Sequence, residues 1–212
     1  MLGLPVLFPA AGHAQTVTVV AFNAENLFDT ADDPDNPRDD TYLPLAVKDQ
    51  RRPQHDLDCE RLNAGSAFFI DQCKTLDWNE QVYATKLQRF ADVIKAMPSL
   101  PDVIVIPETE NKAVLDDLVS RHLSGTGYQV IQLDTSDEPE SRGIDVGMLT
   151  RLPLEGTPAA HKITFGSDDD RCGKTRDILA VPLRLPDGET LHVFGVHFPS
   201  GGNPIQCRIR AS

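Results

Sequence analysis

The sequence has little positive charge and no long hydrophobic run. Its 212 residues include 20 Lys and Arg against 32 Asp and Glu, which gives a formal net charge of −12 at pH 7. Because non-specific nucleic-acid binding depends on Lys and Arg contacts to phosphates, this composition argues against a protein that coats nucleic acid. It leaves open an enzyme that cleaves phosphodiesters at a small metal site. No apolar run approaches the roughly 20 residues of a membrane-spanning helix, so no membrane span is predicted.

The N-terminal segment lacks the cationic residues that usually open a secretory signal, but it has the other features of one. Residues 1–14 are apolar, and the small residues Gly12 and Ala14 precede Gln15 at the spacing of a cleavage site. A buried first strand is the alternative, which Pro5 and Pro9 weaken. We therefore predict a signal peptide over 1–14 and a secreted or periplasmic protein. Residues 15–212 then form one domain, without repeats or linkers.

The sequence also lacks the spacings of common metal sites. None of the four cysteines forms a Cys-x-x-Cys pair or clusters with histidine, so a zinc site is not expected. Four cysteines in an exported chain suggest two disulfides, and the simplest of three connectivities pairs Cys59 with Cys73 and Cys172 with Cys207. The acidic stretch 32–40 lacks the Gly and terminal Glu of an EF-hand. It is predicted to be a solvated loop.

The centre of the chain is a hydrophobic strand followed by two carboxylates. Residues 103–106 are apolar and mostly β-branched, which predicts a strand buried on both faces and ending at Pro107. Glu108 and Glu110 follow, and then Asn111, a favourable helix N-cap. In open α/β sheets, ligands bind outside the carboxyl ends of strands, where Glu108 would lie. The alternative is that both acids only favour the start of a helix.

The remaining pattern predicts an α/β fold with a mixed sheet, antiparallel toward the C-terminus. A capping box from Asp77 to Glu80 precedes an amphipathic helix that stops before Pro98. Residues 41–76 show little periodicity and read as an insertion. A second helix is expected through Leu123. Strands are expected over 16–22, 128–133, 144–150, 177–185 and 190–198, the last two joined by a hairpin turn.

Three polar residues therefore lie at the ends of predicted strands: Asn23, Glu108 and His197. Each has an ordinary explanation, as a turn, cap or core residue. Their expected convergence at one end of one sheet favours a functional site. An Asn carbonyl and a Glu carboxylate are hard oxygen ligands suited to Mg²⁺, and a nearby His can donate to a developing oxyanion or act as an acid.

Five motifs in order resemble the endonuclease/exonuclease/phosphatase superfamily, which has the deoxyribonuclease I-like fold. They are residues 22–29 (FNAENLFD), 107–111 (PETEN), 142–147 (RGIDVG), 175–179 (TRDIL) and 196–200 (VHFPS). The resemblance implies a mixed-sheet α/β sandwich and a metal-dependent phosphodiester or phosphoester hydrolase. An exported nuclease acting by in-line attack of water at phosphorus is favoured, with lipid or sugar-phosphate phosphodiesters as alternative substrates.

The resemblance also implies roles for single residues. Glu108 matches the principal metal ligand, for Mg²⁺ with Mn²⁺ or Ca²⁺ as alternatives. Asn23 matches the residue that helps to hold metal and phosphate. His197 matches the histidine that contacts the scissile phosphate, and Arg176 an arginine that faces the substrate backbone in some members. A monomer is expected.

The sequence departs from the family pattern at two places. Pro107 replaces the usual Gln before the metal-binding Glu. No Gly-Asp-x-Asn or Ser-Asp-His motif, the source of the water-activating Asp and of a second His, follows His197. The expectation is therefore an N-terminal portion of the fold with its C-terminal part missing, inactive by itself. A non-catalytic exported protein that keeps the fold for binding or scaffolding is the alternative.

Overall fold

The computed structural model describes residues 16–34, 36–135, 143–164 and 176–198. Two predictions fall outside these ranges and are not tested by the structure. They are the signal peptide over 1–14 and the Cys172–Cys207 disulfide.

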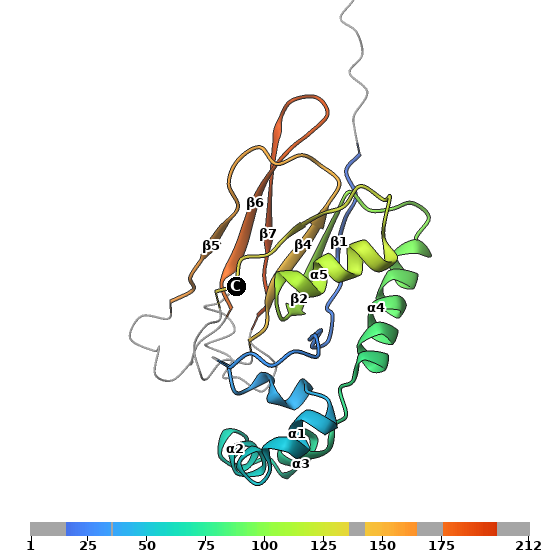
Figure 1. The fold of residues 1–212 in the computed structure, drawn as a ribbon. Coiled ribbons are helices and arrows are strands. Elements are labelled where there is room, and N and C mark those ends of the chain that lie inside the picture. Colours follow the sequence, from blue (N-terminus) through green and yellow to red (C-terminus); the bar gives the residue numbers. More distant parts are fainter. Residues whose placement is uncertain (1–15, 35, 136–142, 165–175, 199–212) are drawn as a thin grey trace, which may run out of the picture.

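Two β-sheets form the centre of the molecule (Figure 1). The first has the strand order β1 (Val19–Ala21), β2 (Val103–Thr109), β4 (Asp145–Thr150) and β3 (Gln129–Ile131). Its first pair is parallel and the other pairs are antiparallel. The second sheet consists of β5 (Ala159–His161), β6 (Ile178–Arg184) and β7 (Thr190–Gly195), all antiparallel. The predicted mixed-sheet α/β class and the predicted β6–β7 hairpin are confirmed.

Strand β2 contributes side chains to two separate hydrophobic clusters. Ile104 and Ile106 pack among residues of the helices, whereas Val103 and Val105 pack among residues of the second sheet. Because side chains alternate between the two faces of a strand, an almost wholly apolar sequence is required at this position. The helices therefore cover one face of the first sheet, and the second sheet covers the other.

The helical layer contains α4 (Glu80–Lys95) and α5 (Lys112–Asp117), which continues into the π-helix η2 (Leu118–His122). The predicted cap of α5 is confirmed, since Asn111 Oδ1 accepts from the Val114 N–H at 3.0 Å. The predicted capping box of α4 is wrong. Asn79, not Asp77, is its N-cap, with Oδ1 accepting from the N–H groups of Gln81 and Val82. Asp77 accepts instead from the Leu45 N–H and from the Asn79 side chain.

We expect Asn79→Ala to lower the free energy of unfolding by about 1 kcal/mol, because two N–H groups at the start of α4 lose their acceptor. Asn79→Ser is the matched control, since serine caps helices nearly as well as asparagine. Urea unfolding followed by circular dichroism measures both variants. Equal losses in the two would contradict the assignment of Asn79 as the cap.

The predicted insertion is helical. It contains the 3-10 helix η1 (Asp39–Tyr42) and the helices α1 (Leu45–Arg51), α2 (Gln54–Leu62) and α3 (Ala67–Thr75), which lie together at one end of the molecule (Figure 1). The predicted Cys59–Cys73 disulfide joins α2 to α3. The three α-helices have only seven to nine residues each, too few for a sustained apolar period, which explains why the sequence shows little periodicity here.

Three strand predictions need correction. Strand β2 continues to Thr109 rather than ending at Pro107. Pro107 remains in register with Val146, and its carbonyl accepts from the Ala24 N–H at 2.9 Å. Proline therefore costs the strand only the one hydrogen bond that a backbone N–H would have donated. Strand β1 is shorter than the predicted 16–22 segment, and β5 was not predicted.

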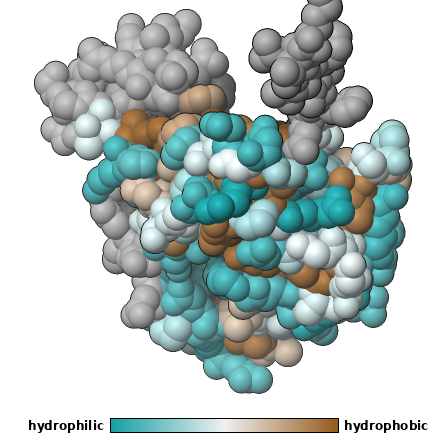
Figure 2. Space-filling model, turned by 90° about the horizontal axis from the view of Figure 1, so that it is seen from above, coloured by the Kyte–Doolittle hydropathy of each residue, from teal (hydrophilic) through white to brown (hydrophobic). Residues whose placement is uncertain are grey.

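Among the described residues, no helix has the length and apolar character needed to cross a membrane. On the face seen from above in Figure 2, hydrophobic residues are interspersed among hydrophilic ones. The exposed side of the molecule in this view is therefore mixed in character.

Candidate active site

The carboxyl ends of β1 and β2 lie side by side, because these strands are parallel and start in register. Their backbones stay joined beyond the end of β1. The Ala24 N–H donates to the Pro107 carbonyl, and the Leu27 N–H donates to the Glu108 carbonyl, both at 2.9 Å. The segment after β1 is thereby held against the last residues of β2. This edge is where open α/β sheets bind ligands.

Glu108 occupies a β-bulge with a left-handed backbone. Its φ is +64°, and the register between β2 and β4 shifts between Pro107 and Thr109. Within the described ranges, Glu25 and Asn26 are the other non-glycine residues with positive φ, at +52° and +64°. Such conformations cost roughly 1–3 kcal/mol each and cluster at functional sites. Here all three occur in two segments that contact each other.

The Glu108 carboxylate joins both segments and the second sheet. Its Oε2 accepts from the Asn26 N–H at 3.1 Å. Its Oε1 lies 3.1 Å from Nε2 of His197, which forms an ion pair when the imidazole is protonated. The side chain keeps 15% of its surface exposed, so the carboxylate remains reachable from solvent.

Lys86 of α4 supports the strained loop from the helical side. Its Nζ donates to the Glu25 carbonyl at 2.5 Å and to the Asn26 carbonyl at 3.0 Å. Burial lowers the pKa of Lys86, while the negative charges of Glu25 and Glu108 oppose that shift. Sequence reasoning missed this residue. The only sequence feature that could have indicated a role for Lys86 is its position beside the buried face of α4, directly before Leu87.

His197 reaches Glu108 from the second sheet, two residues after β7 ends. The approach depends on Gly195. A Cβ atom there would lie 2.8 Å from Val146 Cγ1 and 3.0 Å from Val105 Cγ1. Glycine therefore lets the end of β7 pack closely against β2 and β4. The predicted convergence on one sheet is wrong in this respect, because Asn23 follows β1 and Glu108 lies within β2 of the first sheet, whereas His197 follows β7 of the second.

Glu110 is a structural neighbour of the site. Its Oε2 accepts from the Asp29 N–H at 2.8 Å, and its own N–H donates to the Leu27 carbonyl. Burial raises the pKa of Glu110 to about 8, and the charge of Asp29 adds to the shift. Gln132 Nε2 donates to its carbonyl from the β3 side. Glu110 thus fixes the loop after β1, with its carboxyl group turned into the fold.

Asn23 and Arg176 lie near this edge with partners of their own. The exposed Asn23 accepts from the Glu25 N–H through Oδ1 at 2.7 Å, so it opens the strained loop. Arg176 Nε donates to the Ile144 carbonyl at 3.3 Å, beside the first residue of β4. Of the predicted site residues, Glu108 and His197 make direct contact. Asn23 connects to them through the loop.

Two comparisons with known proteins bear on this geometry. The family model described as Endonuclease/Exonuclease/phosphatase family matches residues 63–206. The chain belongs to this family. It is also similar to a solved structure, the endonuclease/exonuclease/phosphatase from Beutenbergia cavernae DSM 12333, with 21% identity and a TM-score of 0.37. That match covers 55% of this chain and 34% of the other, so this chain matches about a third of the length of its structural relative. A search of curated proteins found no match.

Members of the endonuclease/exonuclease/phosphatase family are generally phosphoesterase-type hydrolases. Glu108 at the bulge and Asn23 in the segment after β1 are the oxygen-bearing side chains that could hold a divalent metal. Glu108 and Asn23 offer carboxylate and amide oxygens, the hard ligands preferred by Mg²⁺. One Glu108 oxygen faces His197 and the other accepts a backbone N–H, which orients the carboxylate.

Proposed function

We propose that the protein is an exported Mg²⁺-dependent phosphodiesterase, with nucleic acid as the favoured substrate class. The observation that supports this most is the contact between Glu108 and His197 across two sheets. This contact brings a carboxylate and an imidazole together from two different sheets, beside a strained loop. Local folding preferences do not explain such an arrangement, which is typical of a functional site. Packing around Gly195 and hydrogen bonds from the Asn26 loop maintain it.

Glu108, with Asn23, would hold the metal ion. When bound, such an ion supplies Lewis-acid stabilisation of the negative charge on a phosphoryl group. The hydrogen bond from the Asn26 N–H orients the Glu108 carboxylate. His197, held beside Glu108, donates a ring N–H to a non-bridging phosphoryl oxygen and stabilises the charge that develops there. Water attacks phosphorus in line with the leaving oxygen.

The surface beside the loop suits an anionic substrate. A groove of about 470 Å³ runs along α4, lined by Gln81, Val82, Thr85, Lys86 and Arg89. Arg89 is exposed in this groove, and Lys86 connects it to the Glu25–Asn26 loop. The net charge of −12 gives the protein no overall electrostatic attraction for phosphates. A cationic side chain close to the site is therefore needed to attract an anionic substrate.

The test uses the full-length protein with linear DNA, RNA, a phospholipid and a sugar phosphodiester, each in MgCl₂ or in EDTA. We expect nucleic-acid hydrolysis that requires Mg²⁺, together with thermal stabilisation by Mg²⁺. Hydrolysis of the phospholipid or sugar ester alone would overturn the choice of nucleic acid. An absence of hydrolysis on all four substrates would overturn the enzymatic proposal in favour of a binding protein.

A further inference from the structure

Three carboxylates outside the Glu108 site gather where η1 begins. Asp32, Asp39 and Asp40 each offer an oxygen atom within 4.8 Å of the others. The prediction of a solvated loop is wrong for these residues, because Asp39 is only 2% exposed and Asp40 is largely covered. Grouping three acids in partly buried surroundings is unfavourable unless positive charge compensates them.

The compensation within the described residues is incomplete. Arg51 of α1 contacts Asp32, and its Nη1 lies 3.2 Å from Asp40 Oδ1. The guanidinium therefore contacts two of the three carboxylates. Asp39 accepts from the Asp33 N–H through Oδ2, but its Oδ1 is buried without a hydrogen-bond partner. A buried oxygen without a partner is costly in a folded protein, and a bound cation would satisfy it.

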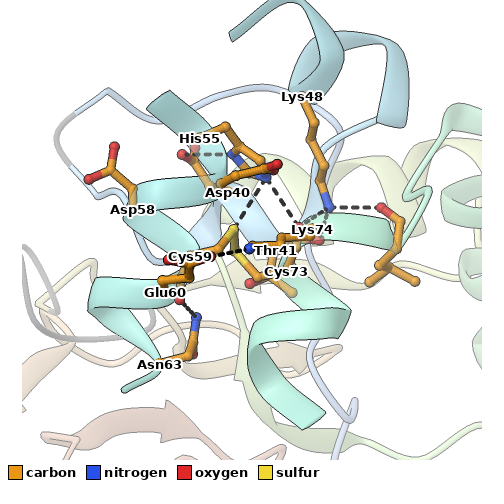
Figure 3. Close-up of a disulfide and its surroundings, with 12 residues drawn as sticks. Asp40, Thr41, Lys48, His55, Asp58, Cys59, Glu60, Asn63, Cys73 and Lys74 are labelled. Carbon is orange, nitrogen blue, oxygen red and sulfur yellow. Dashed lines mark hydrogen bonds and ion pairs between the residues drawn. A yellow bond between two sulfur atoms is a disulfide. The ribbon is translucent and has the colours of Figure 1, made fainter. Parts of the chain in front are cut away.

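A second buried atom faces the same group from the disulfide side. The His55 side chain is fully buried, and its Nδ1 lies 3.7 Å from Asp40 Oδ2 without a hydrogen-bond partner. Its other nitrogen, Nε2, lies 3.2 Å from the Cys73 carbonyl. Figure 3 shows His55 between Asp40 and the Cys59–Cys73 disulfide. The two helices joined by the disulfide therefore pack against the carboxylates on the side of His55.

We propose that Asp32, Asp39 and Asp40 bind a Ca²⁺ ion. Burial raises the pKa of Asp39 to about 8, so a bound cation would take the place of its proton. With all three carboxyl groups ionised, three carboxylates and one guanidinium leave two negative charges, which a divalent cation balances. An all-oxygen set favours a hard cation, and Ca²⁺ accepts the irregular geometry of carboxylates from both ends of a loop better than Mg²⁺ does. Positions 32, 39 and 40 do not follow the ligand spacing of an EF-hand, in which side chains at loop positions 1, 3 and 5 bind the ion.

The cation would join the helical insertion to the sheets. Tyr42 of η1 stacks on Phe28 at 4.1 Å between ring centroids, which fixes one end of the acidic segment. Asn36 lies against Gly143, where a Cβ atom would approach its Nδ2 to 1.9 Å. Gly143 directly precedes the entry to β4. Binding of Ca²⁺ would therefore order a segment packed beside the candidate active site without contributing to its chemistry.

The test is calorimetric titration of the full-length protein with CaCl₂, using the Glu108→Gln background to remove the proposed Mg²⁺ site. Asp39→Asn keeps the shape of the side chain, and we expect it to weaken Ca²⁺ binding about tenfold or more. Asp71→Asn, at an exposed position on α3, is the matched control and should bind as the parent does. Asp32→Asn, at the partly exposed edge of the cluster, provides the same test if Asp39→Asn fails to fold. Absence of Ca²⁺ binding in the parent, or parental affinity in both cluster variants, would overturn the proposal.

Discussion

Glu108→Gln is expected to lower the rate of Mg²⁺-dependent hydrolysis by about a thousandfold or more in the full-length protein. The amide keeps an oxygen that accepts the Asn26 N–H, but it removes the negative charge from the proposed metal ligand. Metal catalysis of this type supplies several kcal/mol of transition-state stabilisation, and about 1.4 kcal/mol corresponds to a tenfold change in rate. Initial rates at saturating Mg²⁺ measure the effect.

The neighbouring Glu110→Gln variant is the matched control. It makes the same chemical change two residues away, on a carboxyl group whose pKa burial already raises to about 8. Near pH 7 the native side chain is therefore mostly neutral, and the amide resembles it. We expect a rate within about threefold of the parent, because Glu110 only fixes the loop through the Asp29 N–H. A similar loss in both variants would indicate a general disturbance of the bulge and contradict the assignment of Glu108.

Features that depend on local sequence could be predicted. The apolar run of β2, the Asn111 cap of α5 and the β6–β7 hairpin each follow from a few adjacent residues. The Cys59–Cys73 pair was also predictable, because the two cysteines are only 14 positions apart in the sequence. For the candidate site, the position of Glu108 directly after a buried strand was the informative signal.

Features that depend on packing between distant segments could not be predicted. Nothing in the residues around Glu108 indicates a left-handed backbone, since glutamate seldom adopts one. The positive φ is imposed by hydrogen bonds from the segment after β1, more than 80 residues earlier. The assignment of His197 to a second sheet likewise depends on how the sheets pack, which alternation along β7 does not reveal.

The helical insertion shows the same limit most clearly at Lys48. A lysine in a weakly periodic segment is expected on the surface, yet Lys48 is fully buried. Its Nζ donates to the carbonyls of Thr41, Cys73 and Leu76 at 2.8, 2.9 and 2.7 Å. An ammonium group has three donors, so each one has an acceptor. Burial lowers the pKa of Lys48 to about 8, which leaves the group mostly charged near pH 7.

Lys48→Met is therefore expected to be strongly destabilising. Methionine has a similar length, but it leaves three carbonyls without their donor at the junction of η1, α3 and the segment before α4. We expect a loss of about 3 kcal/mol or more, since each buried acceptor left without a donor costs about 1–3 kcal/mol. Because a domain is stable by only about 5–15 kcal/mol, this loss is a large fraction of the total.

Lys74→Met separates this effect from the general loss of a lysine in the insertion. Lys74 Nζ pairs with Glu60 at 2.5 Å on α2, and both side chains are partly exposed. Exposed ion pairs contribute at most about 1 kcal/mol, so the control should unfold near the parental urea concentration. The two variants, compared by circular dichroism, distinguish the roles directly. If Lys48→Met costs no more than Lys74→Met, the three carbonyls do not depend on the Lys48 ammonium, and the insertion is stabilised chiefly by its disulfide and apolar contacts.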